Sequence, residues 1–261
     1  MAQWNKINQG FLSNNKTLFE VNMLADQDGN IINSFGAASN IPIASGAVTG
    51  HSHINKFGYS DSIASLSTIW DGSNIYSYST SAGAVTVTSS STDDAGAVIE
   101  VQGLDSSYHL VTQDIVLGAT GATNLIRVFR ARLKTPASGE TTNIGIISVS
   151  IGGDLRAKIL AGKGQTLMAV YTIPAGKTGY LLNLTMSVDK NVDVIYTLMA
   201  REQGGAFNIK GQFGTFGTPI DHNYPIPLVF SEKTDIEIQA DAGNTCGGGA
   251  TFDLILVDNP A

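Results

Sequence analysis

The chain has 261 residues, of which 43% are hydrophobic and only 14% are charged. The apolar fraction supports a substantial core and excludes a disordered chain. The formal net charge is −7 and the basic residues are scattered, which excludes binding to a phosphate backbone through clustered Lys and Arg. The low charge density favours a neutral polar surface that can meet another protein without desolvating many charges.

Cys246 is the only cysteine, so an intramolecular disulfide and a cysteine-based metal site are both excluded. Its glycine-rich surroundings favour a thiol without a catalytic role. The first residues lack the apolar segment of a signal peptide, and no run of about 18 apolar residues is present. We therefore expect synthesis in a cytosol, no export signal and no membrane partner.

Residues 1–57 are expected to form an irregular N-terminal arm. Asp28-Gly29 is a turn signal, and the stretch from Ser34 to Ser52 is rich in Gly, Ala and Ser. A segment with so little side-chain bulk is either flexible or becomes ordered on a partner. An arm of this length before dense strands favours an assembly protein.

From about residue 62 the hydrophobic pattern changes to period two, which is typical of β-strands. Runs of this kind recur about every ten residues with turns between them, as in a β-sandwich or barrel. The runs are Val85–Thr88, Ile99–Gln102, His109–Leu117, Leu125–Leu133 and Gly145–Ile151. We assign residues 58–163 to a first β-sandwich unit.

Residues 164–261 are assigned to a second β-sandwich unit. Its strand-like runs are Leu167–Ile173, Tyr180–Val188, Val192–Arg201, Phe207–Phe216, Thr234–Ala240 and Thr251–Val257. One face of the second run is expected to hold Leu182, Leu184, Met186 and Val188. One face of the last run is expected to hold Phe252, Leu254 and Leu256. Pro225 and Pro227 suit an edge strand or a connecting loop.

The predicted fold class is therefore all-β, with two antiparallel β-sandwich or jelly-roll-like units behind an irregular N-terminal arm. A single sandwich built from strands of both segments stays open as an alternative. The order in which the strands pair does not follow from these patterns.

Groups that could carry catalysis are scarce, with four histidines and six glutamates in the chain. Gly162-Lys163-Gly164 begins like a dinucleotide-binding loop but lacks the third glycine, so a tight turn is the better interpretation. Asp93-Asp94 could lie near a calcium ion, although acidic turns are common. We predict no catalytic residue, no cofactor and no enzyme activity.

Two short clusters each allow a functional and a structural interpretation. His51 and His53 lie two residues apart, so on an extended segment both point to one side; they are either metal ligands or solvated loop residues. Trp70, Tyr76 and Tyr78 are either a platform on which a sugar stacks or the aromatic pairs of a hairpin. The structural interpretation is favoured for both clusters.

Several phrases of the sequence together resemble β-rich virion structural proteins of tailed bacteriophages, many of them marine or freshwater phages that include cyanophages. These phrases are Asn55-Lys56-Phe57-Gly58, Thr68-Ile69-Trp70-Asp71-Gly72, Tyr76-Ser77-Tyr78, Val85-Thr86-Val87-Thr88, Glu100-Val101-Gln102-Gly103, Arg127-Val128-Phe129-Arg130, Asn143-Ile144-Gly145, Ile173-Pro174-Ala175-Gly176 and Phe252-Asp253-Leu254-Ile255. The resemblance covers roughly residues 55–258. His51-Ser52-His53 after Gly50 also resembles the Gly-His-x-His arrangement with which some trimeric phage tail fibres bind iron or zinc.

The resemblance implies a virion component that is made in the host bacterial cytoplasm and forms a homo-oligomer, with a trimer favoured over a dimer. The role we expect is a decoration or cement protein that binds the major capsid protein on the capsid surface. A tail fibre or tailspike that recognises the host is the alternative. A polysaccharide-degrading enzyme is the third hypothesis, but it needs two carboxylates that face each other across a groove.

Overall fold

The computed structural model describes residues 11–12, 18–19, 24–25, 31–32 and 42–260. The chain divides into two compact units, Met1–Ser52 and His53–Ala261. The expected turn at Asp28-Gly29 lies outside the described residues, as do residues 34–41 of the expected Gly/Ala/Ser-rich stretch.

The N-terminal unit contains two very short antiparallel ladders. In the first, β1 (Phe11–Leu12) pairs with β2 (Leu18–Phe19), and in the second, β3 (Leu24–Ala25) pairs with β4 (Ile31–Ile32). One helical turn at residues 42–44 precedes β5.

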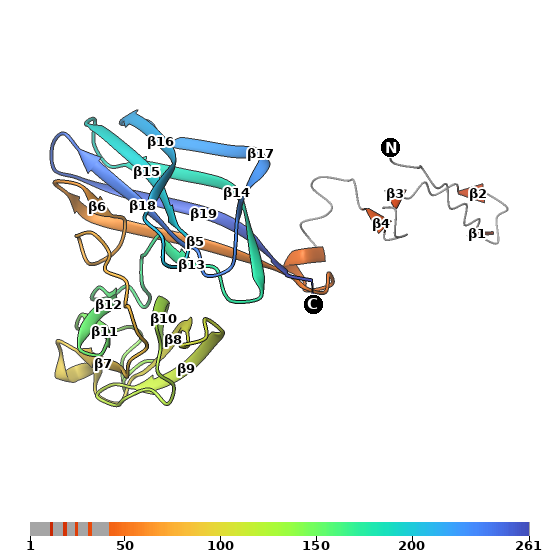
Figure 1. Ribbon diagram of the computed structural model, residues 1–261. Coiled ribbons are helices and arrows are strands. Elements are labelled where there is room, and N and C mark those ends of the chain that lie inside the picture. The colour runs from red at the N-terminus through yellow and green to blue at the C-terminus, as the bar shows by residue number, and fades with distance from the viewer. Residues whose placement is uncertain (1–10, 13–17, 20–23, 26–30, 33–41, 261) are drawn as a thin grey trace. The chain divides into compact units, whose positions relative to one another are not determined.

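The larger part of the C-terminal unit is a sandwich of two antiparallel sheets that face each other (Figure 1). One sheet has the order β13-β18-β15-β16, with β6 paired to β18, and the other has the order β17-β14-β19-β5. The strands are β5 (His51–Ile63), β6 (Ser67–Thr68), β13 (Val170–Thr172), β14 (Lys177–Val188), β15 (Asp193–Arg201), β16 (Asn208–Phe216), β17 (Ile220–Phe230), β18 (Asp235–Ala242) and β19 (Cys246–Asp258).

A smaller lobe is inserted into this sandwich between β6 and β13. It consists of two three-stranded antiparallel sheets, β10-β8-β9 and β12-β11-β7, with its own hydrophobic core. Its elements are β7 (Val85–Ser89), the short 3-10 helix η1 (Thr92–Asp94), β8 (Val98–Leu104), β9 (Leu110–Val116), β10 (Arg127–Thr135), β11 (Ile147–Ile151) and β12 (Asp154–Ile159).

The all-β fold class with antiparallel sheets is confirmed. The boundaries 1–57, 58–163 and 164–261 stay predictions, and the strand pairing adds a feature that they lack. β5 and β6 precede the inserted lobe in the chain, yet they pair with strands that follow it. Residues 51–57 of the expected arm therefore lie in a sheet.

The alternating pattern of the last strand is also confirmed, since Phe252, Leu254 and Leu256 are all buried in the sandwich core. The pattern expected for β14 is wrong at Leu182. A register shift lies between Leu181 and Asn183 in both of the ladders that β14 forms. The bulge turns Leu181 into the core in place of Leu182, because one extra residue reverses the alternation on one side of it.

Candidate assembly surface

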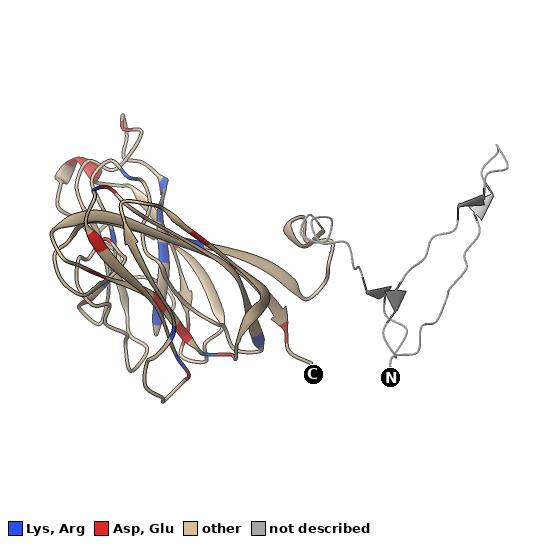
Figure 2. Ribbon diagram, turned by 90° about the horizontal axis from the view of Figure 1, so that it is seen from above, with Lys and Arg blue, Asp and Glu red and all other residues tan. Residues whose placement is uncertain are grey.

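Charged side chains are sparse and scattered over the body, as Figure 2 shows. No group of three or more His, Cys, Asp or Glu side chains that could hold a metal ion occurs among the described residues. A cluster of charged side chains lies between the sandwich and the inserted lobe, where its members bind one another.

Asp235 of β18 is the centre of this buried junction. The guanidinium of Arg127, from the inserted lobe, donates to both carboxylate oxygens at 2.8 and 3.0 Å. Arg201 donates to Oδ2 at 2.6 Å, and the Thr172 hydroxyl donates to Oδ1 at 2.6 Å. Two arginines thus share one carboxylate. A buried arrangement of this kind stabilises the fold only while every partner is present, because removal of one partner leaves an unpaired buried charge.

Lys56 of β5 makes a second connection to the inserted lobe. Its ammonium group is buried, donates to the carbonyl oxygen of Phe129 and lies 5.7 Å from the centre of that ring. Burial, with a smaller contribution from Arg130, lowers the pKa of Lys56 to about 7. This lysine therefore holds the two parts together and does not face a binding surface.

The predicted aromatic cluster also belongs to the interior. Trp70 and Tyr76 are buried with their ring centres 5.0 Å apart in an edge-on arrangement, and Tyr76 donates to the carbonyl oxygen of Val128. Tyr78 continues the stack and packs on Phe207 and Arg201. The buried rings of Trp70 and Tyr76 cannot stack on a sugar in solution, and the half-buried Tyr78 packs against Tyr76, so the cluster serves packing.

The two candidate histidines lie on β5. His51 contacts the carbonyl oxygen of Thr49 through Nδ1 at 3.0 Å. His53 lies 3.0 Å from Oδ1 of Asp253 on β19, and Asn55 donates to the same oxygen at 2.8 Å. The structure thus brings a carboxylate to His53 that the sequence pattern did not indicate. Both histidines lie in a strand and not in the loop that the favoured interpretation expected, and metal binding by His51 and His53 stays the untested alternative.

The acidic turn at Asp93-Asp94 has a structural role in the inserted lobe. Asp94 is buried and accepts hydrogen bonds from the backbone N–H groups of Ile144 and Gly145 at 2.7 and 2.9 Å, and from the Ser89 hydroxyl. Burial acts to raise the pKa of Asp94, but these hydrogen bonds hold it below its ordinary value. Both carboxylate oxygens of Asp94 are therefore already engaged by donors of the protein.

One side of the sandwich, which we call the open wall, is formed by the edge strands β16 and β17. Each ends its own sheet, and in the described part of the chain no ladder joins one to the other. Large apolar side chains on and beside these strands are exposed: Ile195, Ile209, Phe216, Ile226 and Val229. An edge of this kind offers unpaired N–H and C=O groups to another chain.

The two edges of the open wall differ in how they are protected. Four residues of β17, from Tyr224 to Pro227, bulge out opposite Leu182 and include Pro225 and Pro227, as expected for a proline-protected edge. β16 contains no proline, and its one charged residue is Lys210. β16 is therefore the edge that remains available for strand pairing.

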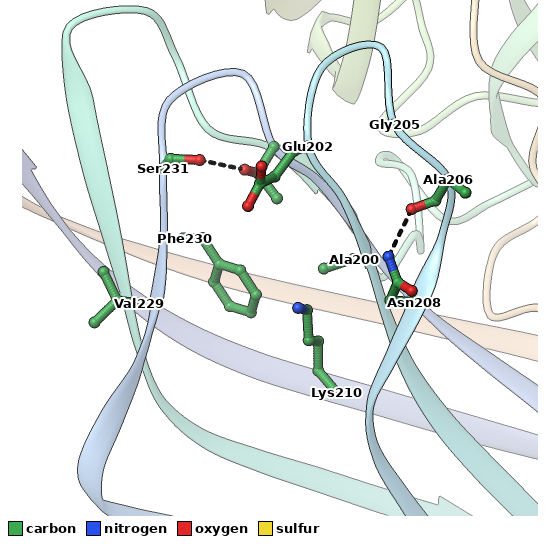
Figure 3. A pocket seen from close by; sticks show the side chains of 10 residues that line it. Ala200, Glu202, Gly205, Ala206, Asn208, Lys210, Val229, Phe230 and Ser231 are labelled. Atoms are coloured by element: carbon green, nitrogen blue, oxygen red, sulfur yellow. Dashed lines mark hydrogen bonds between the residues drawn. The ribbon is translucent and has the colours of Figure 1, made fainter.

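A pocket of about 240 Å³ opens between these two strands (Figure 3). Phe230 and Ala200 lie at its floor, and the Lys210 side chain extends between the strands toward Phe230. Glu202 and Asn208 contribute polar groups to the same lining. An apolar floor with a polar rim suits one side chain of a docked segment better than a reacting substrate.

Sequence reasoning found only part of this surface. It identified β16, but around Pro225 and Pro227 it left an edge strand and a connecting loop both open, because the two prolines and Asp221, His222 and Asn223 interrupt the apolar pattern. An edge strand tolerates such residues, since one of its sides has no partner to satisfy. The proline spacing was the only signal of an edge in the sequence.

Comparisons with known proteins do not assign a family. No family model matches the chain, and no curated protein matches it. Among solved structures, one described as the structure of infectious bursal disease virus Gt strain has a TM-score of 0.21 at 14% identity, covering 80% of this chain and 73% of that chain. The crystal structure of the infectious bursal disease virus VP2 subviral particle has a TM-score of 0.20 at 11% identity, with coverage of 80% and 73%. Scores this low carry no argument about function.

In the part of the chain that the structure describes, no helix has the length and hydrophobicity needed to cross a membrane.

Proposed function

We propose that this chain is a non-catalytic structural component of a tailed-phage virion, and that it decorates and stabilises the capsid shell as a cement protein. The open wall of β16 and β17 is the observation that carries the proposal. It is a partly apolar pair of strand edges with few charged residues, Lys210 and Asp221, on a body in which the buried charges of Arg127 and Asp235 bind one another.

The internal construction supports the same role. A protein that stabilises a shell under pressure needs parts that keep a fixed relative position. Here the inserted lobe is held to the sandwich by the Arg127–Asp235–Arg201 network and by Lys56. The resemblance of residues 55–258 to phage virion proteins points to the same kind of particle.

Cement binding would be repeated at many equivalent sites on a shell. A standard interface of roughly 1,600 Å² is enough for specific attachment, and a homo-oligomer would add avidity. The major capsid protein is the partner that we propose.

The test is reattachment to phage heads that lack this chain. Recombinant full-length protein is mixed with such heads, which are then pelleted and heated while DNA release is followed. The proposal expects the protein to pellet with the heads at a saturable ratio and to raise the temperature of DNA release. Binding to isolated tails or to host cells, with no binding to heads, would contradict it in favour of host recognition.

A further inference from the structure

We propose that residues 1–41 of one copy dock on the β16 edge of a neighbouring copy and extend its sheet by strand addition. This inference rests on the proposed assembly function, and it names the N-terminal segment of the same chain as the partner of the β16 edge.

The acceptor is the outer side of β16. This strand has nine residues, pairs only with β15 among the described strands, and exposes Ile209 and Phe216 at 59% each. Strand addition supplies main-chain hydrogen bonds along such an edge, while side-chain pockets give specificity.

The other edges of the sandwich are less suited to accept a strand. β17 carries two prolines in its bulge. The middle of β5 is covered, because Lys56 is buried against Phe129 and Gly58 lies against the backbone of Ile69 and Ala169. β16 is therefore the long edge that remains open in this sandwich.

The donor is long enough and has the right composition. The 41 residues before Pro42 reach roughly 130 Å when extended, several times the roughly 30 Å length of a nine-residue strand such as β16. They contain only five charged residues, so docking desolvates few charges. Their described ladders, β1 with β2 and β3 with β4, have two residues in each strand, and an isolated hairpin is at best marginally stable in water.

The pocket in the open wall supplies an anchor point. Its volume of about 240 Å³ exceeds the roughly 150 Å³ of a cavity that can hold a benzene ring. Phe11 and Phe19 of the N-terminal segment provide rings of that size. Insertion of one ring over Phe230 would bury both aromatic groups.

Two copies that exchange this contact reciprocally close as a dimer, and a one-way exchange around an axis closes as a ring of three or more copies. A ring of three copies agrees with the trimer expected from the sequence. A direct two-fold contact between two β16 strands would not need residues 1–41, so a variant with a disabled segment would remain oligomeric, which makes the two arrangements distinguishable.

The experiment uses two full-length variants, one that blocks the edge and one that disables the segment. The edge variant combines Ile209→Lys with Gly214→Lys, because lysines protect natural edges and a side chain at Gly214 would meet no atom within 4 Å. The segment variant combines Leu18→Asp with Ile31→Asp, one change in each ladder. Val116→Lys with Gly243→Lys is the matched control on exposed positions elsewhere.

Light scattering after size-exclusion chromatography should show an oligomer for the wild type and the control, and a monomer for each of the two variants. When the two variants are mixed, the segment of the edge variant should dock on the free edge of the segment variant and give a 1:1 pair. Thermal melting should be within a few degrees of the wild type for all variants, since every change lies outside the cores of the body.

Three results would overturn the inference: a monomeric wild type, a segment variant that remains oligomeric, or a mixture that remains monomeric. The head-binding test distinguishes a failure of this inference from a failure of the proposed function. If wild-type protein binds heads but the mixture fails to pair, only the docking of the segment is lost. If the variants pair but the wild type ignores heads, only the cement role is lost.

Discussion

At the scale of single residues, the polar groups of the inserted lobe hold the loops together. Asp94 collects two backbone N–H groups and a hydroxyl at the start of the 144–146 segment. Its sequence context, an acidic pair in a turn, was compatible with a calcium ligand. Only the structure shows that the carboxylate oxygens of Asp94 face the protein, because the two backbone donors lie about 50 positions away in the chain.

Asp94→Ala should lower the free energy of unfolding by about 2–3 kcal/mol, because it leaves buried N–H groups without an acceptor. The depressed pKa of Asp94 means that its stabilisation is present above its ordinary pKa and is lost as the pH falls. Urea titrations at pH 7 and pH 3 should therefore show a smaller difference between the wild type and Asp94→Ala at pH 3. An equal difference at both values would contradict this role.

The pKa of Asp71 is shifted in the opposite direction from that of Asp94. Its Oδ2 accepts from the Leu167 N–H at 2.7 Å, but Oδ1 is buried without a partner in the described protein. Burial raises the pKa of Asp71 to about 7, against the lowering effect of the Leu167 hydrogen bond. The folded state therefore binds a proton that the unfolded state releases near pH 4.

Stability should consequently fall by about 2–4 kcal/mol as the pH rises from 4 to 7, where Asp71 becomes a buried charge. Asp71→Asn should remove this dependence while keeping the oxygen that accepts from Leu167. Guanidinium titrations at pH 4, 6 and 8 would measure the slope for both proteins. Identical slopes would show that Asp71 is not the titrating group.

At the scale of elements, period-two patterns predicted the strands whose faces differ in burial, such as β7, β11 and β19. They missed β5 and β12 and left β17 open as an edge strand or a loop, because these strands carry polar or charged residues on partly exposed faces. They also misplaced Leu182, since a bulge depends on the neighbouring strands and leaves no mark in the local pattern.

The crossing of β5 by the chain near Ala169 gives a test at this scale. A methyl group at Gly58 would overlap the backbone of Ala169 and Ile69, so Gly58→Ala should cost about 1–3 kcal/mol. Gly214→Ala is the matched control, because its added methyl meets no atom within 4 Å. Thermal melting should show a clear decrease for the first variant and almost none for the second. Equal melting temperatures would contradict this packing of β5.

At the scale of the whole molecule, the insertion of one lobe into the other was beyond sequence reasoning. Patterns along the chain give the strands in order, whereas the pairing of β6 with β18 joins residues about 170 positions apart. The junction residues Arg127 and Asp235 also look like ordinary strand residues in the sequence. Only their shared burial shows that they connect the two parts.

Asp235→Ala should destabilise the body by about 3–5 kcal/mol, because it leaves the buried Arg127 without its counter-charge. Asp114→Ala removes an exposed partner of Lys134 and should cost at most about 1 kcal/mol. Hydrogen exchange should show loss of protection in both the sandwich and the inserted lobe for the first variant. Loss confined to one of them would mean that the junction does not couple the two parts.

If this chain is a structural protein of the capsid surface, cryo-electron microscopy of virions of the phage that encodes it should find it there. The account predicts density for the sandwich and its inserted lobe in repeated copies on the outer shell, with the open wall against a neighbouring copy. Density for this fold only on the tail, or its absence from the particle, would contradict the account.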